Sequence, residues 1–308
     1  MVQHLLSMKE LDGKQIESLI DKAIEIKKNQ QKYWSALDHK SLAMVFQKTS
    51  TRTRVSFEVG MTQLGGHALY LDWRTTQFTM SDIKDESKCL SRFVDIIMAR
   101  LLKHADLQKM ADASEVPVIN GLCEKYHPCQ SLGDLMTIKE HKGKLKGLKV
   151  VYLGIGNNVS NTLSLGCVRT GVNFTLCAPE IDPLCIDNDL LAELRKSGLY
   201  KEEKDPKKAV EGADVVYTDT WVNMEFFTDP KFEKEKERRI KTCMPYQLNR
   251  KLVEVTNTLI MHDMPIHRGY EIDDWAIYAP NSIIFDQAEN RLHIQKAIML
   301  WLLGKIKL

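Results

Sequence analysis

The feature that most constrains the fold is a regular alternation of short apolar runs with longer segments compatible with helix. Strands and helices that alternate in this way form parallel sheets with helices on both faces. The sequence therefore predicts an α/β architecture. The predicted strands are 42–46, 68–72, 94–100, 116–120, 149–156, 173–179, 214–220 and 258–265.

A polar, glycine-punctuated segment, EHKGKLKG at 140–147, separates the first four strands from the last four. The C-terminal segment 286–306 has apolar residues at helical spacing, which predicts a long helix that returns to the first domain. We expect two doubly wound parallel-sheet domains joined by interdomain helices. The first would comprise residues 1–140 and 287–308, and the second residues 141–286.

Composition narrows the class of protein. A net charge of +2 excludes the broad basic field of a nucleic-acid-binding protein, and no run of eighteen apolar residues predicts a membrane span. The seven cysteines lack framework spacing, and the N-terminus lacks the apolar core of a signal peptide. We therefore expect reduced thiols and a cytoplasmic location. The mixed charges at 229–241 predict a solvated helix or loop.

The segment STRTR at 50–54 follows a predicted strand and precedes a predicted helix. Free N–H groups and the positive end of the helix dipole meet at such a turn, and the hydroxyls of Ser50, Thr51 and Thr53 add donors. An arginine can grip a phosphate group bidentately, and this segment holds two, Arg52 and Arg54. An anion site is favoured over the alternative, a simple N-cap with solvated arginines.

Two further turns carry polar side chains. In HPCQ, His127 and Gln130 can donate to a carbonyl oxygen and accept from an amide, although His127 alone could be an ordinary loop histidine. A metal role with Cys129 is disfavoured because no second ligand pair has suitable spacing. In GIGNNV, Gly154 and Gly156 only partly match a dinucleotide fingerprint, because Val159 stands where a small residue is needed.

Two later strands end in charged residues. Asp219 follows one strand, and His262 and Asp263 follow another. Open α/β sheets bind ligands at the carboxyl ends of their strands, so these side chains are candidates for a second ligand-binding site. Asp219 could instead only cap a turn.

Together these segments resemble the aspartate/ornithine carbamoyltransferase family over residues 42–303. The segment FQKTSTRTRVSFEVGMTQLGGHALYL at 46–71 matches the family's carbamoyl phosphate signature, while GNNV, TDTWVNM and AENR favour the ornithine branch. The resemblance implies a trimer, or an assembly of trimers, of two-domain subunits that transfer a carbamoyl group to ornithine, giving citrulline and phosphate, with no metal or organic cofactor.

The resemblance also implies roles for particular residues. Arg52, Arg100 and His127 would be catalytic, and Asp263, where this chain departs from the family, is a further catalytic candidate because a carboxylate can accept a proton. Residues implied to bind carbamoyl phosphate are Ser50, Thr51, Arg52, Thr53, Arg100, His127, Gln130 and Arg291. Residues implied to bind ornithine are Asn158, Asp219, Asn223, Met224, Asp263 and Met264.

Three segments depart from the family pattern. Asp263 replaces a cysteine, Asn223-Met224-Glu225 replaces Ser-Met-Gly, and the 72–93 loop is shorter, leaving Gln77 and Lys84 only as candidates. The first two departures surround the amine-binding residues. Alternatives are therefore a carbamoyltransferase for another amino acid or amine, or a non-catalytic carbamoyl phosphate-binding relative. A further alternative, a nicotinamide-dependent oxidoreductase, is supported only by the imperfect glycine motif.

Overall fold

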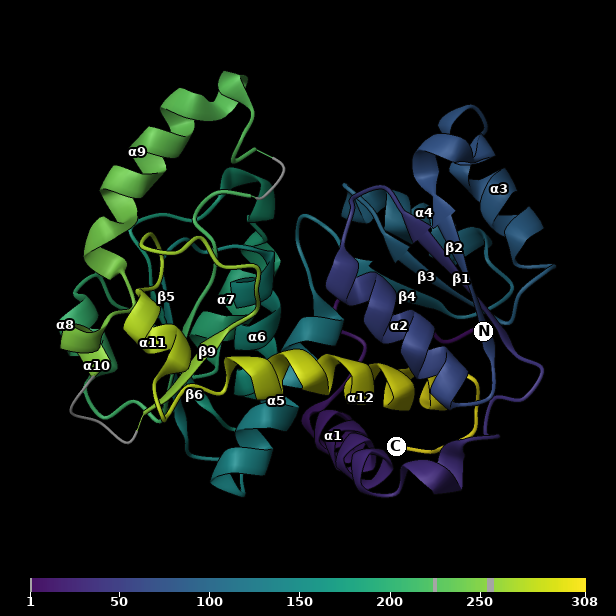
Figure 1. Cartoon of the computed structure of the whole chain (residues 1–308), viewed down its shortest axis with the longest axis horizontal. Helices are drawn as coiled ribbons and strands as arrows, with labels where there is room; N and C mark the ends of the chain where they lie inside the picture. Colours follow the sequence, from purple (N-terminus) through teal and green to yellow (C-terminus); the bar gives the residue numbers. More distant parts are fainter. Residues whose placement is uncertain (1, 224–225, 254–257) are drawn as a thin grey trace. The chain divides into compact units, whose positions relative to one another are not determined.

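The computed structural model describes residues 2–223, 226–253 and 258–308. The chain divides into two compact units (Figure 1). Unit 1 comprises Met1–Met136 and Glu289–Leu308, and unit 2 comprises Thr137–Ala288. The divisions fall inside two helices, α5 (Pro128–Lys142) and α12 (Ile284–Leu302), which carry the chain from one unit into the other.

Unit 1 contains a parallel sheet with strand order β2-β1-β3-β4. Its strands are β1 (Ser41–Phe46), β2 (His67–Asp72), β3 (Ile96–Arg100) and β4 (Val118–Leu122). Its other helices are α1 (Gly13–Lys28), α2 (Thr51–Gln63), α3 (Ile83–Leu90) and α4 (His104–Ala113). The central strands β1 and β3 are almost entirely buried, as expected for a sheet covered on both faces.

The C-terminal part of α12 belongs to unit 1, as the sequence predicts. Lys27 of α1 donates to Asn290 at 2.8 Å, and α2 approaches α12 closely at Gly60. A Cβ atom at Gly60 would lie 3.4 Å from Leu292 and 3.5 Å from both Lys296 and Met299. The beginning of α2 also contacts α12, because Arg291 Nη2 donates to Thr53 Oγ1 at 3.4 Å.

Unit 2 contains a parallel sheet with strand order β7-β6-β5-β8-β9. Its strands are β5 (Lys149–Leu153), β6 (Asn173–Cys177), β7 (Tyr200–Glu202), β8 (Val215–Thr218) and β9 (Leu259–His262). Its helices are α6 (Asn158–Arg169), α7 (Asn188–Lys196), α8 (Pro206–Val210), α9 (Glu233–Cys243), α10 (Arg250–Val253) and α11 (Asp274–Tyr278). Strand β7 is a short edge strand that the sequence analysis did not predict.

The direction of winding reverses between β1 and β3 in unit 1, and between β5 and β8 in unit 2. Such reversals open a crevice at the carboxyl ends of the strands, where ligands bind in doubly wound folds. STRTR, Arg100 and HPCQ follow β1, β3 and β4, while GNNV, Asp219 and Asp263 follow β5, β8 and β9. Each unit therefore gathers one set of predicted site residues at one edge of its own sheet.

Among the described residues, no helix is long and apolar enough to cross a membrane.

Candidate active site

The first set of site residues lies at the N-terminus of α2. Ser50 is the N-cap residue, and its hydroxyl oxygen accepts the Thr53 N–H at 3.3 Å. Thr53 is buried, while Arg52 is half-buried. The anion-site prediction and the N-cap alternative are therefore compatible, because the cap leaves other N–H groups of the first turn for an anion.

The second arginine of STRTR does not join this set. The guanidinium of Arg54 lies 4.1 Å from the centroid of the Tyr70 ring, and its Nε donates to Glu58 at 3.3 Å. Both contacts lie on the exposed side of α2. Positions two apart on a helix point about 160° away from each other, so Arg52 and Arg54 cannot both face a ligand in front of the first turn. Of the two arginines, only Arg52 belongs to the predicted carbamoyl phosphate set, and its role there stays a prediction.

His127 lies in the turn between β4 and α5 and is buried at 3% exposure. Burial, together with the nearby charges of Arg291, Arg100 and Arg52, holds the pKa of His127 well below its usual value of 6.5. Both effects disfavour the imidazolium ion. His127 is therefore neutral near pH 7, and a neutral imidazole can donate one N–H to a substrate oxygen.

Gln130 and Arg291 complete the arrangement in unit 1. Arg291 donates through Nη1 to Gln130 Oε1 and through Nη2 to Thr53 Oγ1, the latter at 3.4 Å. Gln130 in turn donates through Nε2 to Asp134 Oδ1 at 2.8 Å. The buried Nε of Arg291 has no hydrogen-bond partner within the described chain. This donor remains for a ligand, since a buried polar group without a partner is costly.

The second set of site residues lies in unit 2 around Asp219, which is 8% exposed. Asn157 Nδ2 donates to Asp219 Oδ2 at 2.6 Å, and the Thr220 N–H donates to Asp219 Oδ1 at 2.6 Å. The Tyr152 hydroxyl donates to Asn157 Oδ1 at 2.9 Å. Burial and the charges of Asp219 and Asp263 raise the pKa of Tyr152 well above 10, so the phenol keeps its proton.

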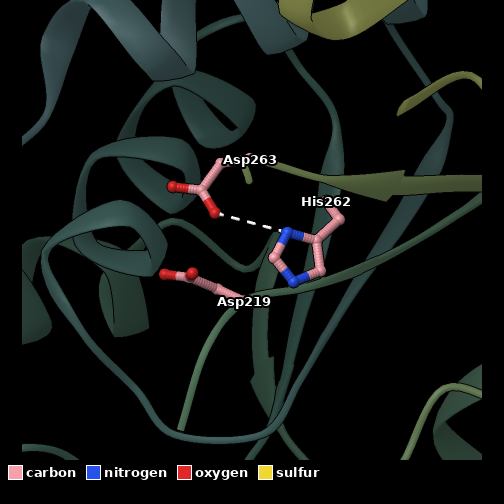
Figure 2. A group of neighbouring side chains, drawn as sticks. All are labelled: Asp219, His262 and Asp263. Atoms are coloured by element: carbon pink, nitrogen blue, oxygen red, sulfur yellow. Dashed lines mark ion pairs between the residues drawn. The ribbon is translucent and has the colours of Figure 1, made fainter. Parts of the chain in front are cut away.

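Asp263 and His262 lie beside Asp219 (Figure 2). Asp263 Oδ1 is 3.6 Å from His262 Nδ1. The imidazole is fixed from both sides, because Nδ1 accepts the Met264 N–H at 2.8 Å and Nε2 bonds to Glu271 Oε1 at 3.1 Å. Glu271 is fully buried and also accepts the His267 N–H at 2.6 Å. The carboxylates of Asp219 and Asp263 thus lie close together, and a cationic ligand between them would relieve their mutual repulsion.

Asp219, His262 and Asp263 each offer a potential ligand atom within 4.8 Å of the others, a spacing that a metal ion could use. The donor chemistry does not fit a metal, because both ring nitrogens of His262 are already hydrogen-bonded to protein groups. A resident metal would need a free imidazole lone pair. An organic ammonium group needs no such lone pair, because it donates its hydrogen bonds to the carboxylates.

The remaining predicted residues of unit 2 occupy varied positions. Asn158 is the first residue of α6, and its Oδ1 accepts the Val159 N–H at 3.1 Å. Asn223 is exposed, and its carbonyl oxygen accepts the Phe226 N–H at 2.9 Å. Met264 is half-buried with φ of 55°. Met224 lies outside the described residues.

Gly154 and Gly156 have a packing role that explains the imperfect dinucleotide motif. A Cβ atom at Gly154 would lie 2.7 Å from Trp221 Nε1, and one at Gly156 would lie 2.9 Å from Ile181 Cγ1. Gly154 also has φ of 111°, which L side chains rarely adopt. These glycines therefore admit side chains of this chain rather than a pyrophosphate.

The candidates of the shortened 72–93 segment are both exposed. Gln77 begins the 3-10 helix η3 (Gln77–Thr79), and Lys84 lies in the first turn of α3.

Four residues outside the predicted site list support these sets: Asp134, Tyr152, Asn157 and Glu271. Asp134 lies one helical turn after Gln130, and Asn157 is the N-cap of α6, so helix spacing and capping rules could have indicated these two. The partnership of Glu271 with His262 depends on how a nine-residue segment folds back, which gives no local signal in the sequence.

The chain matches two family models in succession. Residues 3–140 match "Aspartate/ornithine carbamoyltransferase, carbamoyl-P binding domain", and residues 146–302 match "Aspartate/ornithine carbamoyltransferase, Asp/Orn binding domain". An ornithine carbamoyltransferase of Archaeoglobus fulgidus is 43% identical, over 99% of this chain and 98% of that protein.

Solved structures agree with the sequence comparison. The ornithine carbamoyltransferase of Pyrococcus furiosus superimposes with a TM-score of 0.90 and 42% identity, over 99% of this chain and 98% of the other. An acetylornithine transcarbamylase complexed with acetylcitrulline gives a TM-score of 0.83 and 32% identity, over 97% and 98%. The chain belongs to the aspartate/ornithine carbamoyltransferase family.

Proposed function

We propose that the protein transfers the carbamoyl group of carbamoyl phosphate to the side-chain amine of ornithine, giving citrulline and phosphate. The observation that carries this proposal is the cluster of Arg52, Arg100 and Arg291 around a buried, neutral His127 at the N-terminus of α2. Such a cluster suits a ligand that has both a phosphate and a polar carbonyl group. The similarity to ornithine carbamoyltransferases supports the choice of acceptor.

Unit 1 supplies the groups that bind carbamoyl phosphate. We assign the phosphate to Ser50, Thr51, Arg52 and the N–H groups of the first turn of α2, and the carbonyl oxygen to Thr53, Arg100 and His127. Gln130 and Arg291 face the carbamoyl end. Negative charge grows first on the carbonyl oxygen and then on the departing phosphate, so preorganised donors at both places lower the barrier.

A neutral His127 fits this role. Three arginines already supply positive charge, and a fourth cation in the same buried space would cost further repulsion. The imidazole therefore contributes a directed N–H rather than a charge. It polarises the carbonyl group without giving up its proton.

Unit 2 supplies the groups that bind the amino acid. We assign the α-ammonium group to Asp219, which Asn157 and Thr220 hold in a fixed orientation, and the α-carboxylate to Asn158. Asn223, Met224 and Met264 are proposed to line the same ligand. An acceptor without α-ammonium and α-carboxylate groups, such as putrescine, would leave Asp219 and Asn158 unused.

Asp263 is the proposed proton acceptor. The neutral amine attacks the carbonyl carbon, the new N–C bond forms, and the C–O bond to phosphate breaks with its electron pair going to phosphate. The nitrogen must lose a proton, which passes to Asp263 or to the departing phosphate. A carboxylate beside the amine also favours the ammonium form before attack, so Asp263 raises the pH at which the amine becomes reactive. This chemistry requires no metal or organic cofactor.

A second candidate is a carbamoyltransferase for another amino acid, and a third is a non-catalytic relative that binds carbamoyl phosphate. Both alternatives rest on two departures from the family pattern in the sequence, Asp263 and Asn223-Met224-Glu225. Neither departure affects the unit 1 residues assigned to carbamoyl phosphate. Both alternatives therefore keep carbamoyl phosphate as the ligand and differ only in the acceptor or in the loss of turnover.

We also propose a homotrimer, or an assembly of trimers, in the cytoplasm. The exposed side of α2 supports a subunit interface, because Val55 and Val59, one helical turn apart, are 51% and 38% exposed on it. A surface hollow beside Tyr70 lies in the same region. Contiguous exposed apolar side chains of this kind are typical of protein–protein contacts.

The test measures phosphate release and ureido-product formation from carbamoyl phosphate with ornithine, acetylornithine, lysine, putrescine, aspartate or buffer alone. Turnover confined to ornithine supports the proposal. Turnover with another amine would show that this amine, and not ornithine, is the acceptor. Binding of carbamoyl phosphate without turnover of any amine would refute an enzymatic role.

A further inference from the structure

Asp134 is a buried carboxylate that the proposed mechanism does not use. It lies on α5 one turn after Gln130, with 0% exposure, and its Oδ1 accepts the Gln130 Nε2–H at 2.8 Å. Burying a carboxylate is costly unless charged or hydrogen-bonded partners compensate. Its position next to a site residue therefore suggests a role in that site.

The hydrogen bonds of Gln130 fix the orientation of its amide. Gln130 Oε1 accepts from Arg291 Nη1, while Gln130 Nε2 donates to Asp134. The flipped amide would place an NH₂ group against a guanidinium that only donates, and an oxygen against a carboxylate. Asp134 and Arg291 thus together select the one orientation in which Gln130 accepts from Arg291, and Asp134 holds the other end of the amide.

Arg291 needs such an anchor. It is 5% exposed and close enough to His127, together with Arg100 and Arg52, to depress the pKa of that histidine. Like charges at this depth repel one another. Helix α5 also packs directly against the arginine, since a Cβ atom at Gly133 would lie in van der Waals contact with Arg291 Cδ, at 3.4 Å.

We propose that Asp134 is a positioning residue for carbamoyl phosphate binding. Its buried carboxylate acts through Gln130 to hold the Arg291 guanidinium beside Thr53 at the beginning of α2. This chain of hydrogen bonds links residues of α5, α12 and α2, all of which belong to unit 1. The role in carbamoyl phosphate binding rests on the proposed function, whereas the anchoring of Arg291 rests on the contacts alone.

The test is a double-mutant cycle of Asp134→Asn, Gln130→Glu and the double variant. Asp134→Asn removes the charge and allows the Gln130 amide to flip, and Gln130→Glu places two carboxylates side by side. In the double variant, the carboxylate introduced at position 130 can accept from both Arg291 and the amide introduced at position 134. This exchange restores both hydrogen bonds and the net charge. The measurements are carbamoyl phosphate affinity by calorimetry without amine, turnover, and thermal unfolding.

We expect each single variant to bind carbamoyl phosphate about 10- to 100-fold more weakly, because a buried charged group loses its partner. The double variant should bind more tightly than either. Glu140→Gln, an exposed acid-to-amide change on the same helix, should match the unsubstituted protein.

Single variants with unchanged affinity, or a double variant as weak as the product of the two single effects, would overturn the positioning role. If Asp134→Asn does not fold, a folded double variant supports the proposal and an unfolded one overturns it. Failure of the unsubstituted protein to bind or use carbamoyl phosphate would instead refute the proposed function, and thermal unfolding of the same cycle would still test the anchoring of Arg291.

Discussion

The depressed pKa of His127 makes the stability of the protein depend on pH in a calculable way. In the unfolded chain the imidazole titrates near 6.5, whereas in the folded chain it resists protonation because of burial and three arginines. Below pH 6.5 the unfolded state therefore binds more protons than the folded state, and stability falls as the pH falls. Above that pH both states are neutral at this residue and its contribution vanishes.

The magnitude follows from linkage. If the folded imidazole stays neutral from pH 7.5 to pH 5.5, the unfolding equilibrium rises about tenfold from this residue alone, which is about 1.4 kcal/mol. His127→Asn cannot titrate, so the loss of stability over this range should be smaller in the variant by up to that amount.

Urea unfolding at pH 7.5, 6.5 and 5.5 measures the difference directly, because titration of every other group is common to both proteins. Equal pH dependence in the two proteins would refute the conclusion that His127 is held neutral. It would also remove the argument that the imidazole acts as a neutral donor.

Three further changes test other parts of the account. Arg52→Ala should lower kcat/KM by about 100- to 1000-fold, which is the loss typical of removing one donor to developing negative charge. Arg92→Ala is the control, because Arg92 is exposed and paired with Glu115, and it should have little effect on kcat/KM. Equal effects of the two substitutions would refute the assignment of the phosphate to Arg52. Asp263→Asn should lower kcat by about 100-fold or more while carbamoyl phosphate affinity stays unchanged, and an unaltered kcat would exclude Asp263 as proton acceptor. Gly154→Ala should destabilise the protein by about 1–3 kcal/mol more than Gly198→Ala in chemical denaturation. A Cβ atom at Gly154 would lie 2.7 Å from Trp221 at a φ of 111°, whereas one at Gly198 would meet nothing within 4 Å at a φ of 71°. Equal losses would show that neither the close approach nor the larger φ costs stability.

Much of the fold could be predicted from the alternation of apolar runs. All eight predicted strands exist, although several bounds differ: β3 and β4 begin two residues later than expected, β5 ends at Leu153 rather than Gly156, and β9 ends at His262 rather than Pro265. The end of β9 depends on Met264, whose positive φ no local pattern indicates. The missed strand, β7, is a short edge strand with only Tyr200 buried, so it lacks the apolar pattern on which the prediction depended.

The sequence predicted which strand ends carry the site residues, but it did not predict the contacts between those residues. STRTR and HPCQ indicate donors because a strand end, a turn and a helix start coincide at each of them. The outward orientation of Arg54 and the support of His262 by Glu271 depend on tertiary packing, which residue spacing does not specify. The packing role of Gly154 and Gly156 could not be predicted for the same reason, since the side chains that approach them, Trp221 and Ile181, are distant in sequence.

Transfer of the carbamoyl group to ornithine is tested most directly by NMR, with ¹³C-labelled carbamoyl phosphate and ornithine as substrates. We expect one ¹³C-ureido group on the ornithine side chain for each phosphate released, and a rate of phosphate release well above that in buffer alone. Phosphate release at the same rate with and without ornithine, or label on no product, would contradict it.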